Sequence, residues 1–200
     1  MNITILNYGV GNLYSMKCAL EKIGANPRIA KVNQLQKSTD GLILPGVGNF
    51  TEALENIGSL KKKVLDLVDS GTLVLGVCLG MQIFFKKSEE GRGEGLNLMS
   101  GRVKKLPEHV KIPHMGWNNL KIVRYNEIIE GLTEESYVYF VHSYYPSPSN
   151  KDVIVTKTEY GANFPSILAH KNLYGTQFHP EKSGETGQII LENFVKLSRR

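Results

Sequence analysis

The chain of 200 residues has few cysteines and no long apolar run. Its two cysteines, Cys18 and Cys78, lack the paired spacing of a disulfide framework or a zinc ribbon. No stretch reaches the roughly 18 to 20 apolar residues of a membrane helix, and the N-terminal MNITILNYG lacks the basic region of a signal peptide. These absences argue against export and membrane insertion, and they predict a cytoplasmic protein with reduced thiols.

The charge is only weakly biased, because 24 basic and 19 acidic residues give a formal net charge of +5. The basic residues are scattered and no nucleic-acid recognition motif accompanies them, so a solvated surface is favoured over nucleic-acid binding. A basic face for an acidic protein partner or a phosphate stays open. With 41% hydrophobic and 22% charged residues, the composition fits one globular domain over residues 1–200 and excludes disordered, collagen-like and coiled-coil chains.

The first half alternates short apolar runs with helical patterns, which is typical of βαβ units and a parallel sheet covered on both faces. The patterns predict strands at 3–6, 41–44 and 72–77, and helices at 13–23, 59–69 and 79–87.

The second half is dominated by alternation of apolar and polar residues, which predicts antiparallel or mixed strands. These fall at 102–106, 119–124, 137–144, 153–158, 166–170 and 173–178, before a terminal helix at 186–197. The expected fold is therefore α/β: a single domain with an open, mostly parallel or mixed sheet flanked by helices, and additional antiparallel strands in the C-terminal half.

Cys78 is the first candidate for chemistry, in the segment GVCLG between a predicted strand and a predicted helix. A nucleophile at such a turn needs small neighbours, and it gains an exposed position and the N–H groups of the helix start. By itself the pattern fits a buried core cysteine equally well. Cys18, in a helical segment, is interpreted as such a core residue.

A second candidate, His179 in the segment QFHPEK, follows the last predicted strand. In extended chain, residues two apart point to the same side, so Glu181 can orient the imidazole of His179. A lone His-x-Glu is usually surface polarity. Together with Cys78 it completes a nucleophile, a base and a carboxylate behind the base, which is the pattern of thiol acyl transfer.

The segment LPGVGNF at 44–50 follows another predicted buried strand. Its glycines, Gly46 and Gly48, let the backbone approach a ligand and present N–H groups to it, as an oxyanion hole requires. An ordinary βα turn is the alternative. Three such segments at strand ends favour a site, because open α/β sheets bind ligands there.

These segments, GVCLG with Gln82 after it, FHPEK and LPGVG, resemble the class I, triad-type glutamine amidotransferases. Two more, PHMGWN at 113–118 and YFVHSYY at 139–145, are most similar to the glutaminase subunits of imidazole glycerol phosphate synthases. The resemblance covers essentially the whole chain. It implies hydrolysis of L-glutamine, without cofactor or metal, to supply ammonia for imidazole glycerol phosphate and aminoimidazole carboxamide ribotide formation in histidine biosynthesis.

The resemblance also assigns roles by position. Cys78 would attack the glutamine amide, His179 would move the proton and Glu181 would hold His179. The N–H of Leu79 and a second donor from Gly46-Val47-Gly48 would bind the oxyanion. The expected contacts to the amino-acid end of glutamine are Gln82, Ser143 and Tyr144.

The partner implied by the resemblance is a (β/α)₈ cyclase subunit, in a heterodimer through which ammonia travels. The expected docking residues are Asn12, Pro113, Met115, Trp117, Tyr139 and Lys182. From the residues alone, tryptophan and methionine in a loop are more often a core plug, and the resemblance reverses that reading. We expect the isolated chain to be nearly inactive, because its oxyanion donor lies in a flexible glycine loop.

Other histidines carry no expected chemistry. His142 is interpreted as structural or as an interface residue, and His109, His114 and His170 lack the spacing of metal ligands. A dinucleotide fingerprint at Gly9 fails because Tyr14 stands at its third glycine. Two alternative functions stay open: a glutaminase subunit of another triad amidotransferase, and a non-catalytic interaction subunit.

Overall fold

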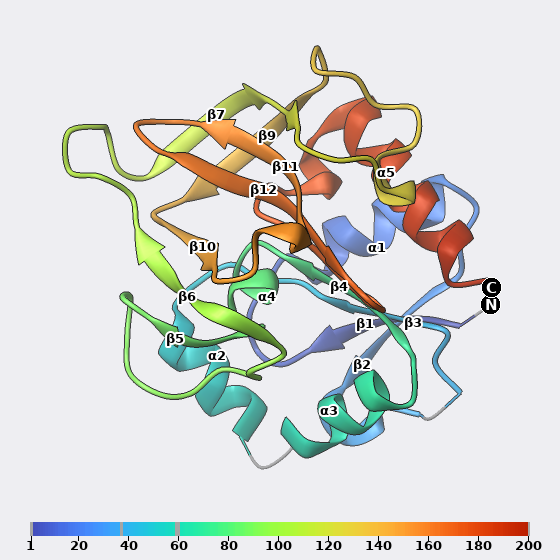
Figure 1. Cartoon of the computed structure of the whole chain (residues 1–200). Helices are drawn as coiled ribbons and strands as arrows, with labels where there is room; N and C mark the ends of the chain where they lie inside the picture. The colour runs from blue at the N-terminus through green and yellow to red at the C-terminus, as the bar shows by residue number, and fades with distance from the viewer. Residues whose placement is uncertain (1, 37, 59–60, 200) are drawn as a thin grey trace.

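The computed structural model describes residues 2–36, 38–58 and 61–199. Its main sheet has the strand order β2-β1-β3-β4-β13-β12-β11-β8 (Figure 1). Five neighbouring strands run parallel, and the last three are antiparallel. In chain order the strands of this sheet are β1 (Ile3–Asn7), β2 (Pro27–Lys31), β3 (Gly41–Leu44), β4 (Leu73–Val77), β8 (Lys121–Ile122), β11 (Ile154–Glu159), β12 (Asn163–His170) and β13 (Leu173–Thr176).

Two small sheets extend this frame. One contains β5 (Phe85–Ser88), β6 (Met99–Lys105) and β10 (Tyr144–Pro148). The other is the antiparallel pair of β7 (His114–Asn119) and β9 (Tyr137–His142).

Helices cover both faces of the main sheet, with α1 and α5 on one face and α2 and α3 on the other (Figure 1). The sheet has a hydrophobic core on each face, and alternate strand residues point into one or the other. Ile5 packs in the cluster with Leu20 of α1, and Leu44 packs in the cluster with Phe50 of α2. The helices are α1 (Leu13–Lys22), α2 (Phe50–Ile57), α3 (Lys61–Asp69), α4 (Leu79–Gln82) and α5 (Gly184–Leu197), with 3-10 turns η1 (Val32–Gln34), η3 (Glu127–Ile129), η4 (Lys151–Val153) and η5 (Pro180–Lys182).

The predicted α/β class with a mixed sheet is confirmed. Strand β2 and helix α2 were not predicted. Helix α2 begins because Asn49 caps it, its side chain accepting hydrogen bonds from Thr51 N at 2.8 Å and Glu52 N at 3.5 Å. The cap fixes the end of the glycine segment that precedes it. Of the predicted helix at 59–69, residues 59–60 lie outside the described residues and the remainder is α3.

The predicted helix at 79–87 is wrong beyond Gln82. The run Ile83, Phe84 and Phe85 is fully buried on all sides, which an amphipathic surface helix does not allow. The chain turns instead, and β5 pairs in parallel with β6. The predicted strand at 137–144 is likewise interrupted at Ser143, where β9 ends and β10 begins.

Two local predictions are also wrong. The segment PHMGWN is not a loop, because most of it forms β7, paired with β9. Cys18 is not a core residue, because α1 presents Met16 and Leu20 to the core and leaves Cys18 exposed.

Candidate active site

Cys78 stands in the turn between β4 and α4, in a backbone conformation that non-glycine residues rarely adopt (φ 53°, ψ −107°). This confirms the strained strand-to-helix turn predicted from GVCLG. The expected exposure is wrong, since the residue is only 6% exposed. Its sulfur therefore lies in the wall of a cavity and not on the outer surface.

The glycines on either side of Cys78 have a steric reason. A Cβ on Gly76 would lie 2.5 Å from the carbonyl oxygen of Gly80, and one on Gly80 would lie 1.8 Å from the carbonyl oxygen of Leu44. No side chain fits at either position. The turn is thus pressed against both its own helix and the neighbouring strand β3.

His179 and Glu181 lie at the end of β13, beside this turn. The imidazole Nδ1 of His179 is 2.9 Å from a carboxylate oxygen of Glu181. The contact is the predicted one, but it is made across the 3-10 turn η5 and not along an extended strand. His179 N donates to the carbonyl of Tyr139 at 3.0 Å, which ties this turn to β9.

The protonation of His179 is set by two opposing effects. Burial lowers the pKa of the imidazole, but the neighbouring Cys78 and Glu181 side chains outweigh burial and raise that pKa to about 10. Nε2 is buried and has no hydrogen-bond partner within the part of the chain that is described. The free nitrogen and the raised pKa suit a group that holds the proton of the Cys78 thiol.

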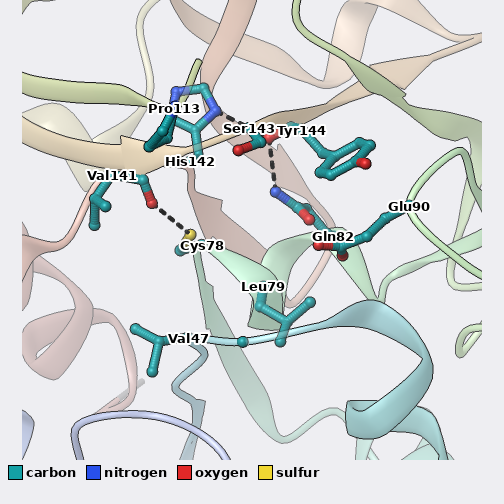
Figure 2. A pocket seen from close by; sticks show the side chains of 11 residues that line it. Val47, Cys78, Leu79, Gln82, Glu90, Pro113, Val141, His142, Ser143 and Tyr144 are labelled. Atoms are coloured by element: carbon teal, nitrogen blue, oxygen red, sulfur yellow. Dashed lines mark hydrogen bonds between the residues drawn. The ribbon is translucent and has the colours of Figure 1, made fainter.

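A cavity of about 220 Å³ opens beside the Cys78 sulfur (Figure 2). Segments from five parts of the chain line it, so it exists only in the folded protein. The lining residues are Val47, Gly48, Cys78, Leu79, Gln82, Glu90, Pro113, Val141, His142, Ser143 and Tyr144. Its volume is below the roughly 300 Å³ of typical drug-sized pockets, which favours a small metabolite.

The predicted oxyanion donors are close to the sulfur. Leu79 is the first residue of α4, and it faces Val47 across the cavity (Figure 2). The N–H groups of a helix start have no partner inside the helix. Gly48, with φ 114°, also lines the cavity, whereas Gly46 lies behind it. A Cβ on Gly46 would be 2.6 Å from Gly80 N, so the glycine segment packs against the Cys78 turn.

The predicted substrate contacts Gln82, Ser143 and Tyr144 all line the cavity. The Nε2 amide group of Gln82 donates to the carbonyl of Tyr144 at 2.8 Å (Figure 2). With its N–H group used by the protein, Gln82 has its oxygen left for a ligand. The Ser143 side chain is half-buried at the point where β9 gives way to β10.

Two cavity residues, Glu90 and Val141, were not predicted from the sequence. Glu90 accepts a hydrogen bond from Phe50 N at 2.8 Å, and burial raises the pKa of its carboxyl. It lies in a polar loop whose sequence carries no motif. His142 was interpreted as structural or as an interface residue; it is buried, and it also lines the cavity.

Most of the residues expected to dock a partner are exposed. Met115 and Trp117 of β7 are 62% and 56% exposed, so a core plug is excluded. Trp117 stacks edge-on against Tyr139, with ring centroids 5.9 Å apart. Lys182 is exposed on η5. Asn12 is also exposed, and its side chain caps α1.

Pro113 was expected on the docking surface as well. It is exposed, and it lines the Cys78 cavity at the same time. Of the residues expected to dock a partner, Pro113 is thus the one that also lines the cavity.

The described part of the chain spans residues 2–36, 38–58 and 61–199. This part contains no group of three or more His, Cys, Asp or Glu side chains able to hold a metal ion. None of its helices is long and apolar enough to cross a membrane.

Comparison with known proteins identifies the family. The model of the class-I glutamine amidotransferases matches residues 4–197. The chain is 48% identical to imidazole glycerol phosphate synthase subunit HisH of Methanocaldococcus jannaschii over 198 residues, covering 98% of this chain and 99% of that protein. It is 46% identical to the HisH subunit of Archaeoglobus fulgidus, covering 99% and 100%.

The fold is shared with solved structures of low sequence identity. PurLQS from Thermotoga maritima superposes with a TM-score of 0.76 at 16% identity, covering 98% of each chain. Sequence family, fold and site geometry agree. This chain belongs to the class-I glutamine amidotransferases and, within them, to the HisH subunits of imidazole glycerol phosphate synthase.

Proposed function

We propose that Cys78, His179 and Glu181 are the catalytic triad with which this HisH-family glutaminase hydrolyses L-glutamine. The observation that carries the assignment is the position of the Cys78 sulfur in the cavity wall, beside an imidazole whose Nδ1 is held 2.9 Å from Glu181. No other cysteine suits the role, since Cys18 is exposed on α1 away from this cavity.

The reaction follows from these positions. The thiol proton moves to His179 Nε2, and the sulfur lone pair forms a bond to the amide carbon of glutamine while the C=O π electrons move to oxygen. The Leu79 N–H and the Val47–Gly48 backbone face that oxygen. When the intermediate collapses, the C–N bond breaks and the nitrogen leaves as ammonia with the proton from His179.

Water completes the cycle. It attacks the γ-glutamyl thioester and gives a proton to His179, and the C–S bond breaks with its electron pair returning to sulfur. Glutamate leaves. Glu181 holds the imidazole orientation in both halves of the reaction.

Recognition of the amino-acid end of glutamine is assigned to the other side of the cavity. The Glu90 carboxylate and the Gln82 side-chain oxygen are acceptors, which suit an α-ammonium group. Ser143 and Tyr144 complete this wall. Glu90 is thus added to the contacts expected from sequence.

The subunit's partner is proposed to be a (β/α)₈ cyclase that forms a heterodimer with it and converts the ammonia. The docking surface is supplied by Asn12, Pro113, Met115, Trp117, Tyr139 and Lys182. The exposed Trp117 ring is of the kind that anchors interfaces. The backbone N–H of His179 donates a hydrogen bond to the carbonyl of Tyr139, so Tyr139 connects this surface directly to the triad. A cytoplasmic location belongs to the same proposal, because thiolate chemistry requires reduced cysteines.

The decisive experiment compares two nitrogen sources with the cyclase present. Cys78→Ala should abolish glutamine-dependent product formation and leave ammonia-dependent formation intact. Cys18→Ala, the matched control, should leave both intact. Loss of both activities in Cys78→Ala would mean that Cys78 supports docking or folding instead.

The alternative functions are disfavoured by specific observations. Full-length identities of 43 to 48% to HisH subunits argue against a subunit of another triad amidotransferase. The intact triad beside a formed cavity argues against a non-catalytic interaction subunit.

A further inference from the structure

A second buried side chain, the amide of Gln177, contacts the sulfur of Cys78. Gln177 lies between β13 and His179 and is fully buried. Its Nε2 is 3.5 Å from Cys78 Sγ, within hydrogen-bond distance for sulfur. The backbone is fixed as well, because Gln177 N donates to the carbonyl of Ser166 at 2.9 Å.

The orientation of this amide follows from its neighbours. The carbonyl oxygen of Tyr144 can only accept, so the Gln82 group 2.8 Å from it must be the NH₂ group. The same NH₂ group lies 3.2 Å from the amide of Gln177, which must present its oxygen there. The NH₂ group of Gln177 is left facing the sulfur.

The Tyr144 carbonyl is itself held by a histidine pair. Nδ1 of His142 lies 2.9 Å from this oxygen and must donate to it. Its Nε2 is then the acceptor for Nδ1 of His114, 3.2 Å away. Burial lowers the pKa of His142 to about 3 and that of His114 to about 4, so both rings are neutral at pH 7. The His114 ring is stacked on Tyr160, with centroids 3.9 Å apart.

We propose that Gln177 donates a hydrogen bond to the Cys78 thiolate, and that Gln82 and His142 are positioning residues that hold its amide in this orientation. The inference rests on the proposed function, in which Cys78 is the nucleophile. As a thiol, Cys78 has the Val141 carbonyl as an acceptor at 3.9 Å. The thiolate cannot donate to that carbonyl and needs donors instead.

Gln177 supplies such a donor at two points of the cycle. Before attack it stabilises the free thiolate. During hydrolysis of the thioester it stabilises the sulfur again, as the C–S bond breaks and the electron pair returns. Hydrogen bonds to charged groups contribute about 1.5 to 3 kcal/mol, which makes this donor worth at least tenfold in thiolate population.

The test measures alkylation of Cys78 by iodoacetamide as a function of pH, using mass spectrometry, in a Cys18→Ser background. Gln177→Met should lower the rate at pH 7 about tenfold and move the half-maximal pH up by about one unit. Gln188→Met on α5 is the matched control and should leave the profile unchanged. An unchanged profile in Gln177→Met overturns the inference.

Two further variants keep the result unambiguous. Gln177→Glu has the size of glutamine and puts a carboxylate beside the sulfur, so it should slow alkylation even if the methionine variant fails to fold. Gln82→Met leaves Gln177 in place but removes the hydrogen bond that orients its amide. The half-maximal pH of alkylation should then shift by less than in Gln177→Met. Equal rates in wild type and Gln177→Glu contradict the proposal.

Failure of the inference is distinguishable from failure of the proposed function. In the chain with both cysteines, Cys78 should react faster at pH 7 than the exposed Cys18. If it does not, Cys78 is no activated nucleophile and the proposed function fails. If it does, but the Gln177 variants react equally fast, only the role of Gln177 is wrong.

Discussion

At the scale of single residues, the site depends on side chains that are buried and yet ionisable. Glu181 makes one hydrogen bond, to His179, while its second carboxylate oxygen is buried without a partner in the described structure. Such a group is retained at a cost in stability. Its orienting effect on the imidazole explains why it is there.

Replacing Glu181 by glutamine should therefore cost activity more than binding. Glu181→Gln keeps the shape but removes the charge that raises the pKa of His179. We expect kcat for glutamine in the complex to fall by about 10² to 10⁴, with KM nearly unchanged. Glu185→Gln, an exposed glutamate of α5, is the control. A loss below threefold in the first variant would contradict the assigned role.

At the scale of elements, two segments form the site around the sulfur: the Cys78 turn and the segment between β3 and α2. The hydroxyl of buried Tyr8 donates to the carbonyl of Pro45, which anchors this segment at its start. Burial, followed by the charge of Cys78, raises the pKa of the Tyr8 phenol. Val47, two residues on, is partly exposed.

Releasing that anchor should loosen the segment between β3 and α2, which is proposed to bind the oxyanion. Tyr8→Phe leaves the Pro45 carbonyl without its donor and should lower the free energy of unfolding by about 1 to 3 kcal/mol in chemical denaturation. Glutamine hydrolysis by the isolated chain should rise at the same time, since the segment becomes free to reorient. Tyr125→Phe, at an exposed tyrosine, should change neither quantity. Loss of stability with unchanged basal turnover would show that the segment is already in its active form.

The close packing of the Cys78 turn gives a second prediction at this scale. Gly80→Ala places a Cβ 1.8 Å from the Leu44 carbonyl, and we expect a loss of more than about 3 kcal/mol of stability or no folded protein. Gly71→Ala has open space and only the strain of φ 89°, and should cost about 1 kcal/mol. Thermal unfolding of both variants shows which loses more stability. Similar losses in the two variants would contradict the prediction.

Elements of simple periodicity could be predicted from the sequence, and elements set by tertiary contact could not. Strand β3 is a plain apolar run, and Cys78, His179 and Glu181 stand in recognisable motifs. From its sequence pattern, β5 is predicted to continue the helix α4. It is a strand only because it pairs with β6, a contact that the local sequence does not show. Gln177 stands in the QFHPEK segment and Glu90 in a loop without a motif. Neither pattern predicts the contact of Gln177 with Cys78 or that of Glu90 with Phe50, because both join residues far apart in the chain.

At the scale of the whole molecule, buried histidines link stability to pH in opposite directions. The folded pKa values of His114 and His142 lie below the usual 6.5, so their contribution is complete above about pH 6.5 and is lost as pH falls toward 4 and 3. The pKa of His179 is raised, so its contribution is complete below about pH 6.5 and is lost as pH rises toward 10.

The acid limb of this profile is testable. Between pH 6.5 and 4, the free energy of unfolding should fall by up to about 1.4 kcal/mol per pH unit for each of the two histidines. His114→Phe keeps the stacked ring and removes one titrating group, so its profile should be shallower than that of wild type. His109→Phe, at an exposed histidine, should keep the wild-type slope. An equal dependence of the unfolding free energy on pH in all three proteins would contradict the conclusion that His114 and His142 are buried and neutral.

Glutamate release, titrated with the cyclase subunit in the presence of the cyclase's ligand, tests the role of Cys78 most directly. Wild type and Cys18→Ala should release little glutamate alone, and the rate should rise and saturate as the cyclase is added. Cys78→Ala should stay at the uncatalysed rate at every ratio, although it binds the cyclase equally well. Glutamate release by Cys78→Ala above that rate would contradict the assignment of Cys78 as the nucleophile.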